Sequence, residues 1–398
     1  RLPERRGGIR GRLAASARLP PMTSDLSVGS YLAARLKEVG VRHVFGVPGD
    51  YSLGLCDMLI HGGVRWVGTC NELNAGYAAD AYARANGIGC ACVTYGVGGF
   101  SVLNACAGAF AESVPLVIVS GAPAARDYVA DPPPDALPHH AVGAQLHAQQ
   151  AAFKPVTGAS VVLLDAEKAP ELIDETLRLC MRDSRPVLIE LPMDVAAAPC
   201  TPPAGRASAW DVRPTHDEQA CAEAVAQVVA ALTRAERPAL LAGVEVHRRN
   251  AQAGVRRLAR VLRVPVATTR HGKTALEEGG TICAGVYAGA MSRNPVREYV
   301  EGADVLLSLG AAKTDIDFFT AELSASAVAV HADSGRVAVR GPEAGGGARL
   351  TVHAPVALGT FIDALALALF DCMGYADLPG AGHAAGAAAA ASTRAGAN

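Results

Sequence analysis

The sequence predicts an α/β fold of two successive three-layer domains, each with a parallel sheet between layers of helices. Three observations lead to this prediction. The chain has 398 residues, which is too long for one ordinary core and suits two domains. Strand and helix patterns alternate along both halves. The strands are continuous apolar runs, which are typical of a parallel sheet covered by helices on both faces.

The first predicted domain covers residues 25–197. Helices are predicted at 27–40, 53–61, 71–87 and 101–112, and strands at 41–47, 64–70, 87–96 and 115–123. Asn71 is placed to cap the third of these helices and Gly87 to end it. Residues 124–150 lack this regularity and are broken by proline. A helix at 168–182 and a strand at 185–192 complete the domain.

The second predicted domain covers residues 216–372, after an exposed linker at 198–215 that is rich in Pro and Ala. Its helices are predicted at 217–235, at 295–301 and at 355–371, and one more is predicted to end at about 262. Its strands are predicted at 238–244, 264–269, 303–310, 327–333 and 349–353. The alternation again indicates a parallel layout.

The two ends of the chain differ from the rest. Residues 1–21 contain six Arg and one Glu, and we expect residues 1–24 to be a disordered extension, with an organellar targeting segment as the alternative. Residues 379–398 contain ten Ala, four Gly and no acid. They offer no large side chains to bury, so we expect residues 373–398 to be a disordered tail.

Composition narrows the class of protein. Apolar residues make up 50% and charged residues 19% of the chain, so global disorder is excluded. The net charge of −2 argues against a nucleic-acid binder, and no apolar run is long enough to cross a membrane. The ten Cys lack zinc-type spacing. We therefore expect no metal site in this chain, reduced thiols and a cytoplasmic location.

Four features contain residues that could carry chemistry. Asp50 ends the turn Pro48-Gly49-Asp50 after a strand, where α/β ligand crevices form, although a turn Asp that caps the next helix looks the same. Glu72 stands in a first helical turn, a place that the helix dipole alone favours for a carboxylate. The glycines of 96–99 allow close backbone approach. His139-His140 lie in the irregular segment, where a solvated pair is the plain alternative.

No common nucleotide or hydrolase motif accompanies these residues. The chain has no GxGxxG after its first strand, no GxxxxGK[ST] loop and no GxSxG elbow. Taken together, the segments VFGVPGDYSLGLCD, TCNELNAGYAADAYAR, TYGVGGFSVLNACAGAFAESVPLVIVSGAP, the His pair and RPVLIELP resemble the thiamine diphosphate-dependent 2-keto acid decarboxylases, such as pyruvate, indolepyruvate and phenylpyruvate decarboxylases. The resemblance covers roughly residues 25–370.

The resemblance implies a fold of three domains, of which this chain matches two. They would be the domain that binds the pyrimidine of thiamine diphosphate (25–197) and the middle domain (216–372). The third domain of the family, which binds the diphosphate through Mg²⁺, carries Gly-Asp-Gly followed by Asn-Asn, and neither motif occurs in this sequence. We therefore expect the diphosphate-binding domain and the Mg²⁺ ligands to be absent and this chain to be a fragment or a truncated paralogue.

The resemblance also implies roles for individual residues. Glu72 would hydrogen-bond the pyrimidine ring of the cofactor, with Pro48 and Val97 beside it. Asp50, His139 and His140 would bind substrate and relay protons. One departure is Gly99, where many relatives carry Glu, so an acid role at this position is not carried over.

The function implied is the non-oxidative decarboxylation of a 2-keto acid, pyruvate or an aromatic one, to an aldehyde and CO₂, with this chain inactive alone. The complete enzyme would be a homodimer or homotetramer, because the family's cofactor lies between subunits. Two alternatives are a non-catalytic truncated paralogue or partner subunit of a full-length decarboxylase, and a carboligase similar to acetolactate synthase. The His pair disfavours the carboligase.

Overall fold

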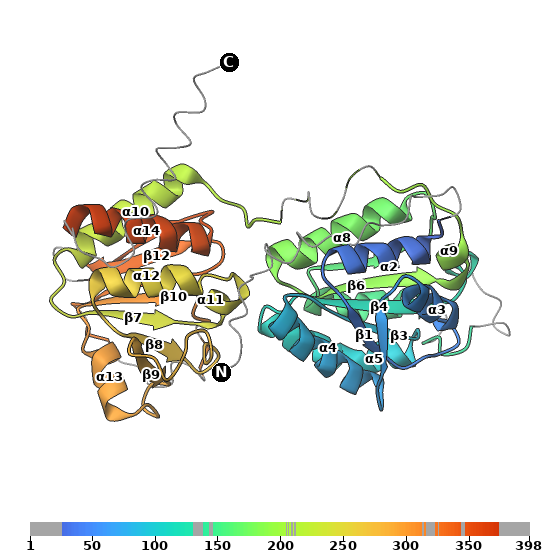
Figure 1. The fold of residues 1–398 in the computed structure, drawn as a ribbon, viewed down its shortest axis with the longest axis horizontal. Coiled ribbons are helices and arrows are strands. Elements are labelled where there is room, and N and C mark those ends of the chain that lie inside the picture. Colours follow the sequence, from blue (N-terminus) through green and yellow to red (C-terminus); the bar gives the residue numbers. More distant parts are fainter. Residues whose placement is uncertain are drawn as a thin grey trace, which may run out of the picture. The chain divides into compact units, whose positions relative to one another are not determined.

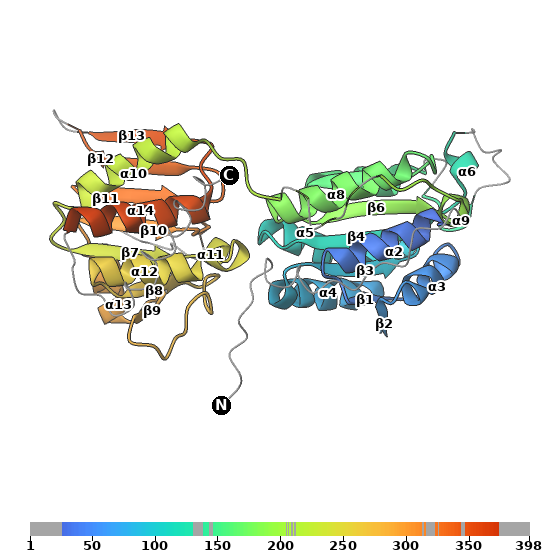
Figure 2. The ribbon, with the colours of Figure 1, turned by 45° about the horizontal axis from the view of Figure 1, so that its top comes forward.

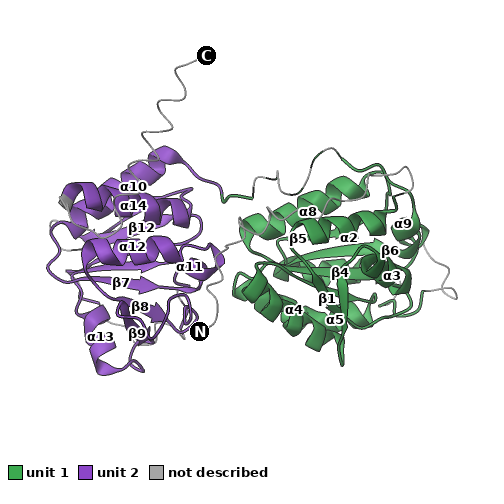
Figure 3. Cartoon of the chain, in the orientation of Figure 1, with its two compact units in different colours: residues 1–214 green, residues 215–398 purple. Residues whose placement is uncertain are grey.

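The computed structural model describes residues 26–129, 138–142, 146–203, 205, 207, 210, 212–312, 314, 315, 323, 324, 326–343 and 347–373. The chain divides into two compact units, residues 1–214 and 215–398 (Figure 3). The expectations for residues 1–24 and for the tail from 374 onward lie outside the described residues. No helix in the described part of the chain is both long and apolar enough to cross a membrane.

Unit 1 is a three-layer α/β domain (Figure 1). Its six strands pair in the order β2-β1-β3-β4-β6-β5, and every pair is parallel. The strands are β1 (His43–Gly46), β2 (Arg65–Gly68), β3 (Gly89–Val93), β4 (Leu116–Ala122), β5 (Ala159–Val162) and β6 (Val187–Pro192). β3, β4 and β6 are buried along their whole length, which explains their continuous apolar sequence.

Helices cover both faces of this sheet. They are α2 (Val28–Glu38), α3 (Leu53–His61), α4 (Glu72–Asn86), α5 (Val97–Ala111), α6 (Ala125–Val129), α7 (Ala148–Phe153), α8 (Ala169–Asp183), α9 (Met193–Ala197) and the 3₁₀ turn η1 (Lys154–Val156). One core joins α2, α3, α8 and α9 to the sheet, and another joins α4, α5 and α7 to its opposite face. The three-layer prediction is therefore confirmed for this unit.

The ends of α4 follow the prediction from the sequence. Asn71 caps the helix, since its side chain accepts a hydrogen bond of 2.8 Å from the backbone N–H of Asn74. Gly87 ends the helix with a φ of 97°, a left-handed conformation that glycine adopts without strain. The Asn71 cap fixes where α4 begins and places Glu72 in its first turn.

Unit 2 has a mixed sheet of seven strands in the order β13-β12-β11-β10-β7-β8-β9 (Figure 2). The strands are β7 (Pro238–Ala242), β8 (Val266–Thr269), β9 (Cys283–Tyr287), β10 (Val305–Leu309), β11 (Val328–Ala332), β12 (Val337–Pro342) and β13 (Ala348–His353). The helices are α10 (Glu218–Leu232), α11 (Val244–Arg248), α12 (Gln252–Leu262), α13 (Asn294–Glu301) and α14 (Leu358–Met373). α10, α12 and α14 share one core, and α13 packs on the other face.

The prediction of a wholly parallel second sheet is wrong at one edge. β12 pairs antiparallel with both β11 and β13. Only the four residues 333–336 connect β11 to β12, which suffices for a hairpin, whereas a parallel crossover needs a dozen residues or more. β5, β9 and β12 are strands that the sequence reading missed.

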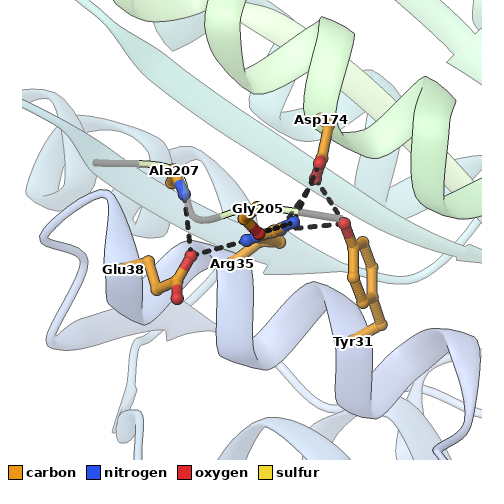
Figure 4. A network of polar contacts seen from close by, with 6 residues as sticks. All are labelled: Tyr31, Arg35, Glu38, Asp174, Gly205 and Ala207. Carbon is orange, nitrogen blue, oxygen red and sulfur yellow. Dashed lines mark hydrogen bonds and ion pairs between the residues drawn. The ribbon is translucent and has the colours of Figure 1, made fainter. Parts of the chain in front are cut away.

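A buried charge cluster holds the end of unit 1 in place (Figure 4). Arg35 of α2 makes two hydrogen bonds, of 2.9 and 3.0 Å, to the carboxylate of Asp174 in α8. It also pairs with Glu38 at 2.7 Å and donates to the carbonyl of Gly205 at 3.1 Å. Glu38 in turn accepts from the N–H of Ala207. Ala207 is buried, so the expectation of an exposed linker is wrong at this residue.

Candidate functional site

The candidate residues gather at the carboxyl edge of the six-stranded sheet. Pro48 and Asp50 follow β1. Glu72 begins α4 after β2, and Val97 begins α5 after β3. Because β1 pairs in parallel with β2 and with β3, these three segments leave the sheet at the same edge, where α/β folds form ligand crevices. Pro48 is exposed and Val97 is 57% exposed, so both present their side chains at the surface of this edge.

His139 lies between Asp50 and Tyr51. Its Nε2 is 3.3 Å from Oδ2 of Asp50, and its Nδ1 is 2.9 Å from the hydroxyl of Tyr51. The rings of Tyr51 and His139 also stack, with centroids 4.4 Å apart. Both ring nitrogens of His139 thus have a partner that orients the imidazole, while the side chains of His139 and Asp50 stay 50% and 76% exposed.

The phenol of Tyr51 is suited to this orienting role. Burial, followed by the charges of Asp127 and Asp50, raises the pKa of Tyr51. The hydroxyl therefore keeps its proton at neutral pH and stays available as a donor. Its one proton is donated to the backbone carbonyl of His139 at 3.1 Å, so the hydroxyl oxygen can accept a hydrogen bond from Nδ1 of His139.

His140 is held through its backbone. It has a φ of 65°, and its carbonyl oxygen would lie 2.3 Å from a Cβ on Gly96. Only glycine leaves room for this approach, so the backbone of His140 packs directly against Gly96. The ring of His140 meets that of His139 edge to face at 4.7 Å, and its side chain is exposed. The structure therefore brings together Asp50 and the predicted histidine pair.

Glu72 is half-buried beside the same glycine-rich segment. Its Oε1 would lie 3.3 Å from a Cβ on Gly98, the second residue of α5. The carboxylate of Glu72 makes no hydrogen bond or ion pair with any described residue. Gly96 contacts His140, and Gly98 lies beside Glu72. The N-terminal end of α5, with Gly96 at its cap, therefore contacts both residues, and residues 97–99 belong to this helix rather than to a separate loop.

Thr94 is a site residue that the sequence reading missed. It follows β3 directly and lies between the turn after β1 and the first turn of α5, because a Cβ on Gly49 would lie 2.5 Å from its Cβ and one on Gly98 would lie 3.2 Å from its Cγ2. Its Oγ1 is buried and has no hydrogen-bond partner among the described residues. A buried hydroxyl without a partner is costly. The only signal in the sequence was its place directly after an apolar strand.

A buried polar network lies beneath this edge, and it too escaped prediction. Oε1 of Gln149 accepts from the N–H of Gly96 at 2.8 Å. Its Nε2 donates to Oγ of Ser120 at 3.0 Å and to Oε2 of Glu190 at 2.6 Å. The hydroxyl of Tyr128 donates to Oε1 of Glu190. The network spans β4, β6, α6 and α7, elements far apart in the sequence.

Gln149 also explains the departure at Gly99. A Cβ on Gly99 would lie 1.9 Å from Oε1 of Gln149. A side chain at position 99 would displace this buried amide, which is anchored by three hydrogen bonds. The hydrogen bonds of Gln149 in this chain therefore require glycine at position 99.

Clustered metal ligands are not found in the described part of the chain. Within the described ranges, no group of three or more His, Cys, Asp or Glu side chains is arranged to hold a metal ion. All ten cysteines are free. Cys90 and Cys92 of β3 are completely buried, as expected for core packing.

Comparison with known proteins agrees with this layout. Residues 26–152 match the model of the thiamine pyrophosphate enzyme N-terminal TPP-binding domain, and residues 225–342 match the model of the central domain of these enzymes. The chain is similar to pyruvate decarboxylase 1 of Pisum sativum, with 37% identity over 73% of this chain and 49% of the relative.

Fungal relatives give similar values. Identity is 39% to pyruvate decarboxylase of Aspergillus fumigatus, and 36% to pyruvate decarboxylase isozyme 2 of Saccharomyces cerevisiae. Each alignment covers 74% of this chain and 52% of the relative. The chain therefore spans about half the length of the relatives it matches.

Proposed function

The chain belongs to the thiamine pyrophosphate enzymes, and from this premise we propose that unit 1 supplies the pyrimidine-binding half of an active site that decarboxylates a 2-keto acid. The products are an aldehyde and CO₂. The observation that carries the proposal is the carboxylate of Glu72 beside Gly98, which has no partner among the residues that the structure describes. It lies at the same sheet edge as the pair of Asp50 and His139.

The residues at this edge fit an aminopyrimidine ring. A site for a flat heterocycle needs space for the ring and a group that hydrogen-bonds the ring nitrogen. Buried polar atoms that line the site need hydrogen-bond partners once the ring is bound. The absence of a Cβ on Gly98 provides space beside Glu72. The carboxyl group of Glu72 has no competing partner within the described ranges. The buried Oγ1 of Thr94 lacks one as well, and a bound ligand atom would satisfy it.

The proposed role of each residue follows from its contacts. Glu72 holds the ring nitrogen of the pyrimidine. Asp50 and Tyr51 fix the His139 imidazole, which then exchanges protons with the substrate or the product. A positioned acid–base group of this kind contributes typically about 10²–10⁴-fold in rate. Thiamine diphosphate, when bound, supplies the electron sink that loss of CO₂ requires.

Pyruvate is the substrate that we propose first. The relatives reported above are named pyruvate decarboxylases, which supports decarboxylation over a carboligation reaction. We also propose that the Mg²⁺ and diphosphate of the cofactor are bound by groups outside the residues described here, because the Gly-Asp-Gly and Asn-Asn motifs that the resemblance assigns to this role do not occur in this sequence.

Calorimetric titration of the chain with thiamine diphosphate and Mg²⁺ tests the proposal. We expect Glu72→Gln to weaken binding by about tenfold or more, since a hydrogen bond involving a carboxyl group contributes roughly 1.5–3 kcal/mol. Glu167→Gln is the matched control, because Glu167 is exposed on another part of unit 1. Equal affinities of wild type and Glu72→Gln would contradict the assigned role of Glu72.

A further inference from the structure

Glu190 is a buried carboxylate that the proposed reaction does not use. It lies in β6 with an exposed fraction of 0%, opposite Ser120 of β4. Its side chain points to the face of the sheet that α5 and α7 cover, as the contact with Gln149 shows. A fully buried carboxylate is rare unless it is paired, and no cation pairs with Glu190 among the described residues. Such a group calls for an explanation.

The partners of Glu190 lead directly to the candidate site. Gln149 donates to Glu190 and accepts from the N–H of Gly96. Gly96 is the glycine against which the carbonyl of His140 packs, and Val97 follows it. The amide side chain of Gln149 therefore connects Glu190 to Gly96, the residue against which His140 packs.

Neighbouring contacts tie the same segment from the other side. The hydroxyl of Tyr95 donates to the carbonyl of Leu146 at 2.6 Å, three residues before Gln149. Tyr128, the second donor to Glu190, packs its ring against His147 at 5.2 Å. Leu146 and His147, which shortly precede Gln149, are thus held beside the same buried polar network.

We propose that Glu190 is a positioning residue for His139 and His140, the residues to which we assign substrate binding. In its ionised form it accepts from both Gln149 and Tyr128, which fixes the amide of Gln149 on Gly96 and so holds His140 and His139 at the sheet edge. When Glu190 gains a proton, one of its oxygens becomes a donor and loses an incoming hydrogen bond, and the hold on Gly96 loosens. The role of the histidines in catalysis rests on the proposed function, but the hold itself does not.

The surroundings of Glu190 place this change near neutral pH. Burial raises the pKa of Glu190 to about 7, while the hydrogen bonds from Tyr128 and Gln149 lower it. Among the residues that the structure describes, the other titratable groups facing it are Tyr128 and Tyr95, whose pKa values are raised, largely by burial. Both phenols therefore remain protonated donors. Ser120 from β4 and Gln149 from α7 carry no charge, and His147 reaches the cluster only through the ring of Tyr128.

Hydrogen–deuterium exchange of the Gly96 amide, measured on the chain without cofactor between pH 6 and pH 8, tests the proposal. A group with a pKa of about 7 goes from about nine-tenths to about one-tenth protonated over this range. We therefore expect the protection factor of the Gly96 amide to rise about tenfold in the wild type. In Glu190→Gln, which keeps the size of the side chain, we expect no rise.

Two further variants complete the design. Glu245→Gln is the matched control, because burial also raises the pKa of Glu245 but this residue lies in unit 2, and it should behave as the wild type. Tyr128→Phe removes one donor to the ionised carboxylate and should move the rise to higher pH. It keeps the test decisive if Glu190→Gln fails to fold.

A protection factor that is independent of pH in the wild type would overturn the proposal, as would an equal rise in Glu190→Gln. Because the experiment requires no thiamine diphosphate, a failure to bind the cofactor would count against the proposed function alone. The two failures are therefore distinguishable.

Discussion

Nε2 of His139 lies 3.3 Å from Oδ2 of Asp50, although 89 positions separate the two residues in the chain. Asp50 leaves β1, whereas His139 comes from the segment beyond β4 and α6. The stacked ring and hydroxyl of Tyr51 hold the imidazole from its other side. This arrangement leads to predictions about how the pair acts.

Asp50 and His139 are expected to act as a unit. In the holoenzyme, Asp50→Asn and His139→Gln should each lower kcat/KM for pyruvate by about 10²-fold or more, since each disables the same acid–base group. The double variant should lose little beyond either single variant. Steady-state kinetics measure these values. Asp57→Asn, an exposed change on α3, is the control, and full additivity of the two losses would show that the residues act separately.

Gly98→Ala should separate binding from stability. The new Cβ would lie 3.2 Å from Cγ2 of Thr94 and 3.3 Å from Oε1 of Glu72, so we expect weaker binding of thiamine diphosphate. Alanine is otherwise favoured over glycine in a helix by roughly 0.5–1 kcal/mol. Gly108→Ala lies in the same helix with nothing within 4 Å of its Cβ. It should stabilise the fold and leave calorimetric affinity unchanged, and an equal loss of affinity in both variants would refute the idea.

Replacement of Arg35 is expected to lower the free energy of unfolding of unit 1 strongly. Its side chain is 4% exposed and that of Asp174 15%. Arg35→Met leaves the carboxylate of Asp174 buried without a cation, which should cost about 3–5 kcal/mol in the free energy of unfolding. Lys168→Met breaks an exposed pair with Asp165 and should cost under about 1 kcal/mol.

Urea unfolding followed by tryptophan fluorescence measures both costs. The chain has two tryptophans, Trp66 and Trp210, and both belong to unit 1, so the signal follows this unit. Similar losses for the two variants would show that the buried cluster of Arg35 contributes no more than a surface pair.

The ionisation of Glu190 should make the stability of unit 1 depend on pH. Its pKa in the folded state, about 7, is raised above the ordinary value of 4.5. The folded state therefore binds the proton more tightly, and the associated stability is present below about pH 4.5 and is lost as pH rises toward 7. The total is roughly 3 kcal/mol.

The same fluorescence assay checks this sign. The free energy of unfolding of the wild type, taken relative to Glu190→Gln, should fall between pH 4.5 and pH 7 and stay level above it. Glu167→Gln, an exposed change, should track the wild type. If the free energy of unfolding of the wild type instead rose with pH relative to that of Glu190→Gln, the folded-state pKa of Glu190 would be lowered rather than raised.

Local signals in the sequence predicted much of unit 1. Asn71 and Gly87 fixed the ends of α4 because caps act within a few residues. The apolar runs of β3 and β4 predicted a parallel sheet, and strand ends located Asp50 and Glu72 on its edge. These features need no knowledge of distant parts of the chain.

Features that depend on distant contacts were not predictable in this way. Glu190 stands within an apolar strand, and its partner Gln149 is 41 positions away, so nothing local marks the pair. Thr94 resembles any strand-end residue until Gly49 and Gly98 pack around it. β12 was missed because only its pairing with β11 and β13 shows that it is a strand.

We propose that the hydrogen bond from Glu72 to the pyrimidine of the bound cofactor speeds the loss of the proton at C2 of its thiazolium ring. The most direct measurement is the rate of hydrogen–deuterium exchange at C2 of thiamine diphosphate in the holoenzyme, compared between wild type and Glu72→Gln. The account predicts a rate at least about 10²-fold lower in the variant. An unchanged exchange rate in a variant that still binds the cofactor would contradict it.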